Sequence, residues 1–182
     1  MKGLARILGI FLLIMVSSSS FAQDVQFGFK GGLSLTTLGV DAPDGELKLG
    51  FLAGPYAILK ASDKIAIQPE LVYAAQGMKV SNDGTGKYNY VNLPVILKWY
   101  PTADFNFQAG PQLGLLTSAK LDDVDVSDQL NTLDFAFGLG FGVSSNNIDL
   151  DFRYNLGLSN TAKNDEKLPN RVIQFSIGYR FN

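Results

Sequence analysis

The residues of this chain with the strongest chemistry are charged side chains that alternate with apolar ones along extended segments. From Ile148 to Ser159 one face is wholly apolar, while the other carries Asp149, Asp151 and Arg153. Alternate residues of a strand point to opposite faces. Eight charged residues occupy polar faces of this kind: Lys30, Glu70, Lys98, Asp134, Asp149, Asp151, Arg153 and Arg180. Four cations match four anions, which favours a paired structural network; an ion or proton path is the alternative.

The order of the segments along the chain predicts which of these charges meet. We expect Arg180 beside Asp149 or Asp151, because these residues lie on the last two segments. Glu70 and Lys98 lie on the third and fourth segments, which are also consecutive, so we expect them near each other. An unpaired charge is too costly to persist in an interior of low dielectric constant.

Catalytic and ligand-binding signatures are weak. The sequence contains no histidine, which excludes Ser-His and Cys-His triads and the usual imidazole base. We therefore expect no enzyme, no cofactor and no metal site. Residues 122–128 carry four aspartates but lack the glycine and spacing of an EF-hand, so a solvated loop is favoured over a calcium site. Six aromatic residues near segment ends are typical of interfacial girdles rather than of a stacking site: Tyr88, Tyr90, Trp99, Tyr100, Phe105 and Phe107.

Eight segments of period two must position the charged residues. They cover approximately residues 25–35, 49–59, 65–76, 91–99, 105–115, 134–143, 148–159 and 173–181. No apolar face carries a charge, and a basic residue facing lipid at the bilayer midplane would cost about 2–4 kcal/mol. So many apolar faces cannot all be buried against one another in 182 residues. We predict an all-β fold: an eight-stranded antiparallel up-and-down transmembrane β-barrel, with lipid outside and polar groups inside.

The connections between segments alternate in length. Residues 61–64, 101–104 and 144–147 form short connections, whereas 36–47, 77–87, 117–131 and 160–170 form long polar ones. This alternation predicts short periplasmic turns, longer extracellular loops and two periplasmic termini.

The glycines of the chain support a narrow barrel, whereas its prolines conflict with a continuous hydrogen-bond ladder. Many glycines fall at inward positions, where an eight-stranded barrel has room only for side chains. Four prolines lie within predicted strands, although proline cannot donate to a hydrogen-bond ladder: Pro55, Pro69, Pro94 and Pro111. We expect local bulges to accommodate them.

The N-terminus predicts export. Residues 1–22 have the basic start, apolar stretch and small-x-small end of a secretory signal peptide, which leaves residues 23–182 as the barrel domain. Cleavage would remove two of the 15 basic residues and none of the 17 acidic ones, so the mature net charge is −4. This charge gives no support to nucleic-acid binding. An exported chain with this patterning, no cysteine and no apolar run of about 18 residues after the signal indicates the outer membrane of a Gram-negative bacterium.

Short motifs add a family resemblance. They are Gly28–Gly32, Ile67–Leu71, Leu93–Val95, Gly110–Pro111 and Arg153–Leu158. Over residues 24–182 the chain resembles the PorT-like outer-membrane β-barrel domain proteins, whose architecture is related to the small OmpA- and OmpX-type barrels. The resemblance implies an eight-stranded barrel in contact with outer-membrane lipids and the barrel-assembly machinery. Because the family's namesake takes part in protein secretion, it also implies a possible protein partner in a secretion or envelope complex.

Three functions follow from these observations. The first is a structural, adhesive or assembly and secretion-partner role exercised through extracellular loops, with the lumen plugged by the polar network. The second is a narrow channel or transporter. The third is a soluble, lipocalin-like exported carrier, which requires apolar residues inside and charges outside. The charges, the inward glycines and the loop asymmetry together favour lipid outside.

Overall fold

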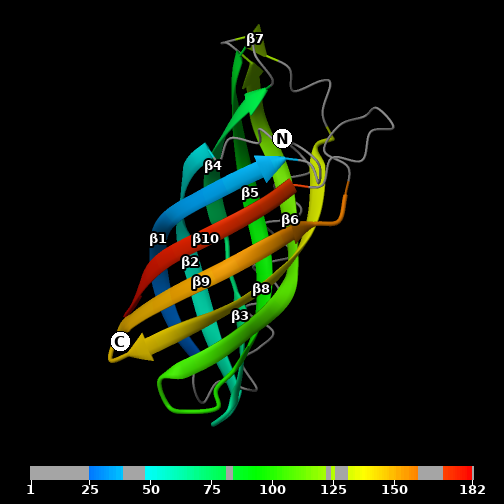
Figure 1. The fold of residues 1–182 in the computed structure, drawn as a ribbon. Coiled ribbons are helices and arrows are strands. Elements are labelled where there is room, and N and C mark those ends of the chain that lie inside the picture. Colours follow the sequence, from blue (N-terminus) through cyan, green and yellow to red (C-terminus); the bar gives the residue numbers. More distant parts are fainter. Residues whose placement is uncertain are drawn as a thin grey trace.

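The computed structural model describes residues 25–38, 48–80, 84–121, 124–125, 131–159 and 170–181. The predicted signal peptide lies outside these ranges. Within them the chain forms antiparallel strands (Figure 1): β1 (Val25–Leu38), β2 (Lys48–Ser62), β3 (Ile65–Pro69), β4 (Val72–Val80), β5 (Gly84–Trp99), β6 (Phe105–Leu121), β7 (Val124–Asp125), β8 (Leu133–Ser145), β9 (Ile148–Gly157) and β10 (Asn170–Phe181). No helix among the described residues is long and apolar enough to cross a membrane.

These strands close into an eight-stranded barrel, which confirms the predicted fold. Each strand pairs with its neighbours in sequence, and β1 pairs with β10 to complete the circle. The β3 and β4 segments are two halves of one barrel strand, because both keep the same register against β2 and against β5. The two-residue β7 only extends the hairpin at the end of β6.

The prolines are accommodated differently from our expectation of bulges. The register shifts lie between Lys60 and Ser62 and between Asn89 and Tyr90, whereas the register is constant on both sides of every proline position. Where β3 gives way to β4, Glu70 N donates to Pro94 O at 2.9 Å and Leu71 N donates to Pro55 O at 3.0 Å.

Neither proline can return a hydrogen bond, because neither has an N–H. The ladder therefore loses one hydrogen bond on each side of the barrel strand formed by β3 and β4, and this strand is interrupted without a change of register. Pro55 and Pro94 thus explain why one barrel strand is divided into β3 and β4.

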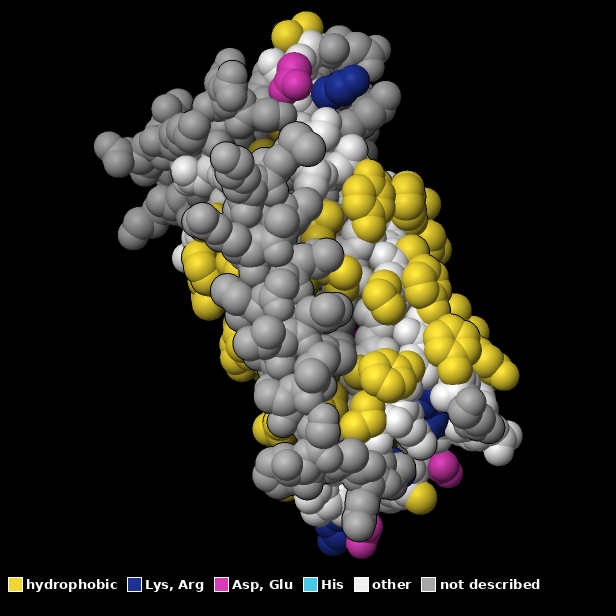
Figure 2. Space-filling model, turned by 180° about the vertical axis from the view of Figure 1, so that it is seen from behind, with side chains coloured by type: hydrophobic (Ala, Val, Ile, Leu, Met, Phe, Trp, Pro, Cys, Tyr) yellow, Lys and Arg dark blue, Asp and Glu magenta, His cyan; other side chains and the backbone are white. Residues whose placement is uncertain are grey.

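The outer wall is apolar and the inner wall is mixed. Along β9 exposed and buried residues alternate strictly from Ile148 to Arg153. Phe152 is 38% exposed and Phe175 54% exposed, which is the reverse of what a soluble carrier with an apolar lumen requires. Figure 2 shows the hydrophobic side chains spread over the wall between charged groups near the two ends.

Two predictions about inward residues need correction. Tyr88 and Tyr90 are buried inside the barrel and do not belong to an outer girdle, because they share the parity of the inward Asn92. Tyr100 does not belong to it either, since it packs against the buried Tyr56, Ile58 and Ala66. The lumen is also less polar than expected. Three small apolar clusters lie in it, formed by Leu52, Val72 and Ala74, by Tyr56, Ile58 and Ala66, and by Tyr88, Tyr90 and Ala119.

The short connections meet at one end of the barrel. Tyr100 N donates to Lys64 O at 2.8 Å, and Ser144 N donates to Asp104 O at 2.7 Å. Arg180 N donates to Asn147 O at 2.7 Å, so the end of β10 lies there too. Figure 1 shows the C-terminus at this end and β7 at the opposite one. We call these the short-turn end and the loop end.

Candidate functional site

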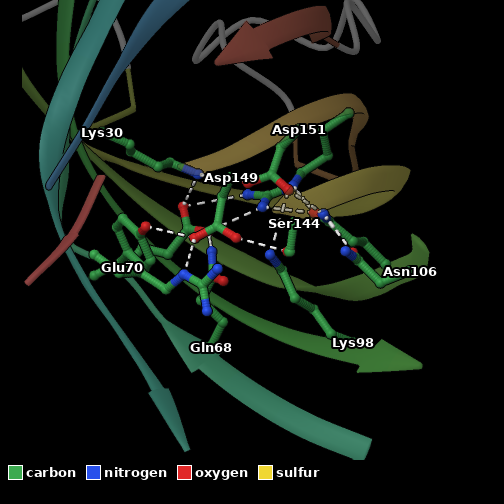
Figure 3. A network of polar contacts seen from close by, with 12 residues as sticks. Lys30, Gln68, Glu70, Lys98, Asn106, Ser144, Asp149 and Asp151 are labelled. Atoms are coloured by element: carbon green, nitrogen blue, oxygen red, sulfur yellow. Dashed lines mark hydrogen bonds and ion pairs between the residues drawn. The ribbon is translucent and has the colours of Figure 1, made fainter. Parts of the chain in front are cut away.

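Five charged side chains meet inside the lumen, and Figure 3 labels four of them, Lys30, Glu70, Lys98 and Asp151. The five residues are Lys30 on β1, Glu70 at the interruption between β3 and β4, Lys98 on β5, and Asp151 and Arg153 on β9. None of these side chains is more than 5% exposed. Inward parity brings them together, because each occupies an alternate position whose neighbours face the outer wall.

Glu70 is the hub of this central network. Its Oε2 lies 2.8 Å from Lys30 Nζ. The Arg153 guanidinium donates to both carboxylate oxygens, from Nη2 to Oε1 at 2.9 Å and from Nη1 to Oε2 at 3.2 Å. A bidentate arginine–carboxylate pair of this kind is directional as well as strong.

Asp151 binds the remaining cation. Lys98 Nζ lies 3.3 Å from Asp151 Oδ1, and Lys30 Nζ lies 4.0 Å from Asp151 Oδ2. No ion pair joins Glu70 to Lys98 among the described residues, and Glu70 pairs with Lys30 and Arg153 instead. The reason is geometric: in a narrow lumen, long side chains reach partners on opposite walls, and strand order does not decide the pairing.

Neutral amides complete the central network. Gln68 Nε2 donates to Glu70 Oε1 at 2.7 Å. Gln108 accepts from Arg153 Nη2 at 2.9 Å through its Oε1, and its Nε2 donates to Asp151 Oδ1. The inward parity of both glutamines is visible in the sequence, but their bridging role was not predicted, because parity does not tell which inward groups touch.

A second layer lies toward the short-turn end, centred on Asp149. Arg180 Nε lies 3.2 Å from Asp149 Oδ2, so the expected neighbour of Arg180 is present. Tyr56 donates its hydroxyl to Asp149 Oδ2 at 2.6 Å, and Ser144 donates to Oδ1 at 2.6 Å. Sequence reasoning missed Tyr56, whose inward position is on the predicted strand with the weakest pattern.

Asp134 lies apart from the other seven charges. Its carboxylate accepts a hydrogen bond from Ser159, and no ion pair to it occurs within the part of the chain that the structure describes. It lies near the start of β8, toward the loop end, whereas the central network lies closer to the short-turn end. The eight predicted charges thus form two layers and one separate carboxylate.

Inward glycines on nearby strands make room for these large side chains. A Cβ at Gly138 would lie 2.6 Å from Asn155 Oδ1 and 3.2 Å from Arg153 Cδ. A Cβ at Gly178 would lie 2.7 Å from the Tyr56 hydroxyl. Inward glycine is therefore the local feature that lets arginine and tyrosine cross so narrow a barrel.

A cavity of about 500 Å³ opens at the short-turn end. Its lining residues include Gln26, Ile58, Lys60, Tyr100 and Arg180. A smaller cavity toward the loop end is lined by Asp134 and Asn155, among others. Along β9, Asp151 and Arg153 lie between the levels of the two cavities, so the central network separates them.

The chemistry available in the lumen is that of ion pairing. Every charged group of the central network has a partner of opposite charge. Among the described residues, no group of three or more His, Cys, Asp or Glu could hold a metal ion. Most of the acidic stretch 122–128 lies outside the described residues, so its expected solvation stays a prediction.

Comparison with known proteins agrees with this architecture. A family model described as outer membrane protein beta-barrel domain matches residues 21–163. No curated protein sequence matches the chain. Among solved structures, Neisserial surface protein A is 14% identical with a TM-score of 0.65, and the match covers 87% of this chain and 100% of that one.

Two further structures have the same fold. The attachment invasion locus protein Ail of Yersinia pestis is 13% identical with a TM-score of 0.56, over 87% of this chain and 100% of that one. The outer membrane enzyme PagL is 9% identical with a TM-score of 0.53, over 82% of this chain and 98% of that one. Identities this low show a common fold alone. On the family match, this chain belongs to the outer membrane protein β-barrel domain family.

Proposed function

We propose that this outer-membrane protein is a plugged, non-conducting and non-enzymatic barrel that acts through its extracellular loops. Its role would be structural, adhesive or that of a partner in a secretion or envelope complex. The observation that carries the proposal is the central network, which joins opposite walls of the lumen with buried ion pairs.

A steady ion current would have to break this network. Glu70 accepts hydrogen bonds from Arg153 and Gln68, and it pairs with Lys30 as well. A hydrogen bond to a charged group contributes about 1.5–3 kcal/mol. A passing ion would displace several of these bonds at once, and the close approach of Arg153 and Asn155 to Gly138 supports tight packing at this level.

Two likenesses suggest different roles for the loops. Ail, which has the same fold, is described as an attachment invasion locus protein and has been crystallised with the heparin analogue sucrose octasulfate. The resemblance to the PorT-like proteins favours a protein partner in secretion instead. We propose that long connections such as 39–47 and 160–169, which lie outside the described residues, carry whichever contact is made. Outer-membrane lipids and the barrel-assembly machinery are the other proposed partners.

Planar-bilayer recording tests the plug. The purified barrel is expected to show no steady current at moderate voltage. A double variant that removes the hub and its main cation, Glu70→Ala with Arg153→Ala, is expected to leak more than the wild type. Steady, uniform openings of the wild-type protein would refute the plug and favour the channel.

Topology is tested by cysteine labelling, since the chain contains no cysteine. A Lys163→Cys variant in a long connection should react with a membrane-impermeant maleimide in intact cells. The matched Lys64→Cys variant in a short connection should react only after the outer membrane is permeabilised. The reverse pattern would place the long connections in the periplasm.

The role of a long connection is tested by replacing residues 160–169 with a short Gly-Ser turn. This change should abolish surface attachment or partner recovery without loss of the folded barrel.

A further inference from the structure

The outer wall carries a depression where β5, β6 and β8 lie side by side. The strand registers place Leu97, Ala109 and Leu139 in one row across the three strands. The middle residue is small and its two neighbours are large. The result is an apolar groove of about 370 Å³, lined by Leu97, Trp99, Phe107, Gln108, Ala109, Leu139 and Gly140.

The groove exposes hydrocarbon and no charge. Leu97, Trp99, Phe107 and Leu139 are each about half exposed, and none of the lining residues is ionisable. A headgroup or a charged peptide would find no partner in it. The occupant must therefore be apolar along its whole contact length.

The depth of the groove in the membrane narrows the choice further. The ladder between β6 and β8 runs from Phe105 to Leu115, and Ala109 is close to its middle. A ladder of that length is about what a tilted strand needs to span the hydrocarbon core. Toward the short-turn end the groove borders stacked aromatic rings, with Trp99 and Phe107 centroids 5.7 Å apart. The ladder ends at Phe105, two residues beyond Phe107, so the membrane interface lies past this ring pair on the side of the short-turn end.

We propose that this groove binds one acyl chain of a membrane phospholipid from the leaflet at the short-turn end. A chain whose headgroup lies at the interface beyond Phe105 would run past Trp99 toward Ala109. Its methylenes would fill the space that the small alanine side chain leaves, and they would gain dispersion contacts that a flush wall does not offer. This site goes beyond the proposed loop function, and it rests on the proposed contact with outer-membrane lipids.

The single tryptophan of the chain provides the test, because Trp99 lines the groove. Detergent-solubilised protein is titrated with phosphatidylcholine carrying brominated acyl chains, which quench tryptophan on contact. Wild-type fluorescence should fall along a saturable curve. Ala109→Phe, which fills the groove, should lose the saturable part and keep only a shallow linear decrease. Ala53→Phe is the matched control: Ala53 lies on β2, pairs with Gly31 and Tyr73, and should leave the saturable curve unchanged.

The outcomes separate the possible occupants. Equal quenching of wild type and Ala109→Phe overturns the proposal. So does a wild-type dimer in light scattering that Ala109→Phe converts to a monomer, since a second copy would then fill the groove. If Ala109→Phe does not refold, as judged by heat-modifiable gel mobility, Ala109→Leu provides the same comparison with a smaller side chain.

Discussion

Replacing Glu70 by glutamine should destabilise the barrel more than any other single isosteric change in the lumen. The central network contains three cations, Lys30, Lys98 and Arg153, and two carboxylates, Glu70 and Asp151. The substitution leaves three buried cations with one carboxylate, and it turns an acceptor toward Arg153 into an amide. Removing one partner of a buried ion pair costs about 3–5 kcal/mol. Because glutamine has nearly the same volume, little of this loss would come from packing.

Urea-induced unfolding of the barrel in lipid vesicles measures the effect, with Trp99 fluorescence and gel mobility as independent signals. The control is Asp104→Asn, since Asp104 is exposed at the short-turn end and should change stability by no more than about 0.5 kcal/mol. Adding Arg153→Gln to Glu70→Gln restores the excess of one cation. The double variant should therefore lose at least about 1 kcal/mol less unfolding free energy than the sum of the losses in the two single variants. A loss below about 1 kcal/mol for Glu70→Gln, or simple additivity, would refute the network as a coupled unit.

The remaining predictions use the same unfolding assay. Gly32→Ala should destabilise the barrel by about 1–3 kcal/mol, because its Cβ would lie 2.7 Å from a backbone atom of β10. Gly31→Ala should be tolerated, since its Cβ would meet nothing nearer than 3.9 Å. Equal effects of the two substitutions would contradict the close packing of β1 against β10 at Gly32. Tyr56→Phe should cost about 1.5–3 kcal/mol, since it removes the 2.6 Å hydrogen bond to the buried Asp149, and an unchanged midpoint would mean that water replaces the hydroxyl. Leu139→Arg should cost about 2–4 kcal/mol because the side chain faces lipid near mid-depth; a neutral outcome would place this wall in water.

The amino-acid sequence by itself determined the fold class and the two faces of the wall. Period two is a local property, so the parity of Asp149, Asp151 and Arg153 was enough to assign them to the lumen. The absence of charge from every apolar face then predicted a closed barrel, which the structure and the family match support. The positions of the inward glycines could be predicted from the same period-two pattern.

Contacts across the lumen were decided only by the tertiary structure. Lys98 binds Asp151, and Glu70 binds Lys30 and Arg153, because closure brings opposite walls within reach of long side chains. No local pattern encodes that distance.

The prolines and the groove illustrate the same limit. Pro55 and Pro94 lie on the two strands that flank the interruption, so a ladder can lose hydrogen bonds there without a bulge. Ala109 lines a groove because strand register sets it between Leu97 and Leu139. Parity is set along a strand, but register and cross-lumen distance are set between strands, and they exist only once the sheet has closed.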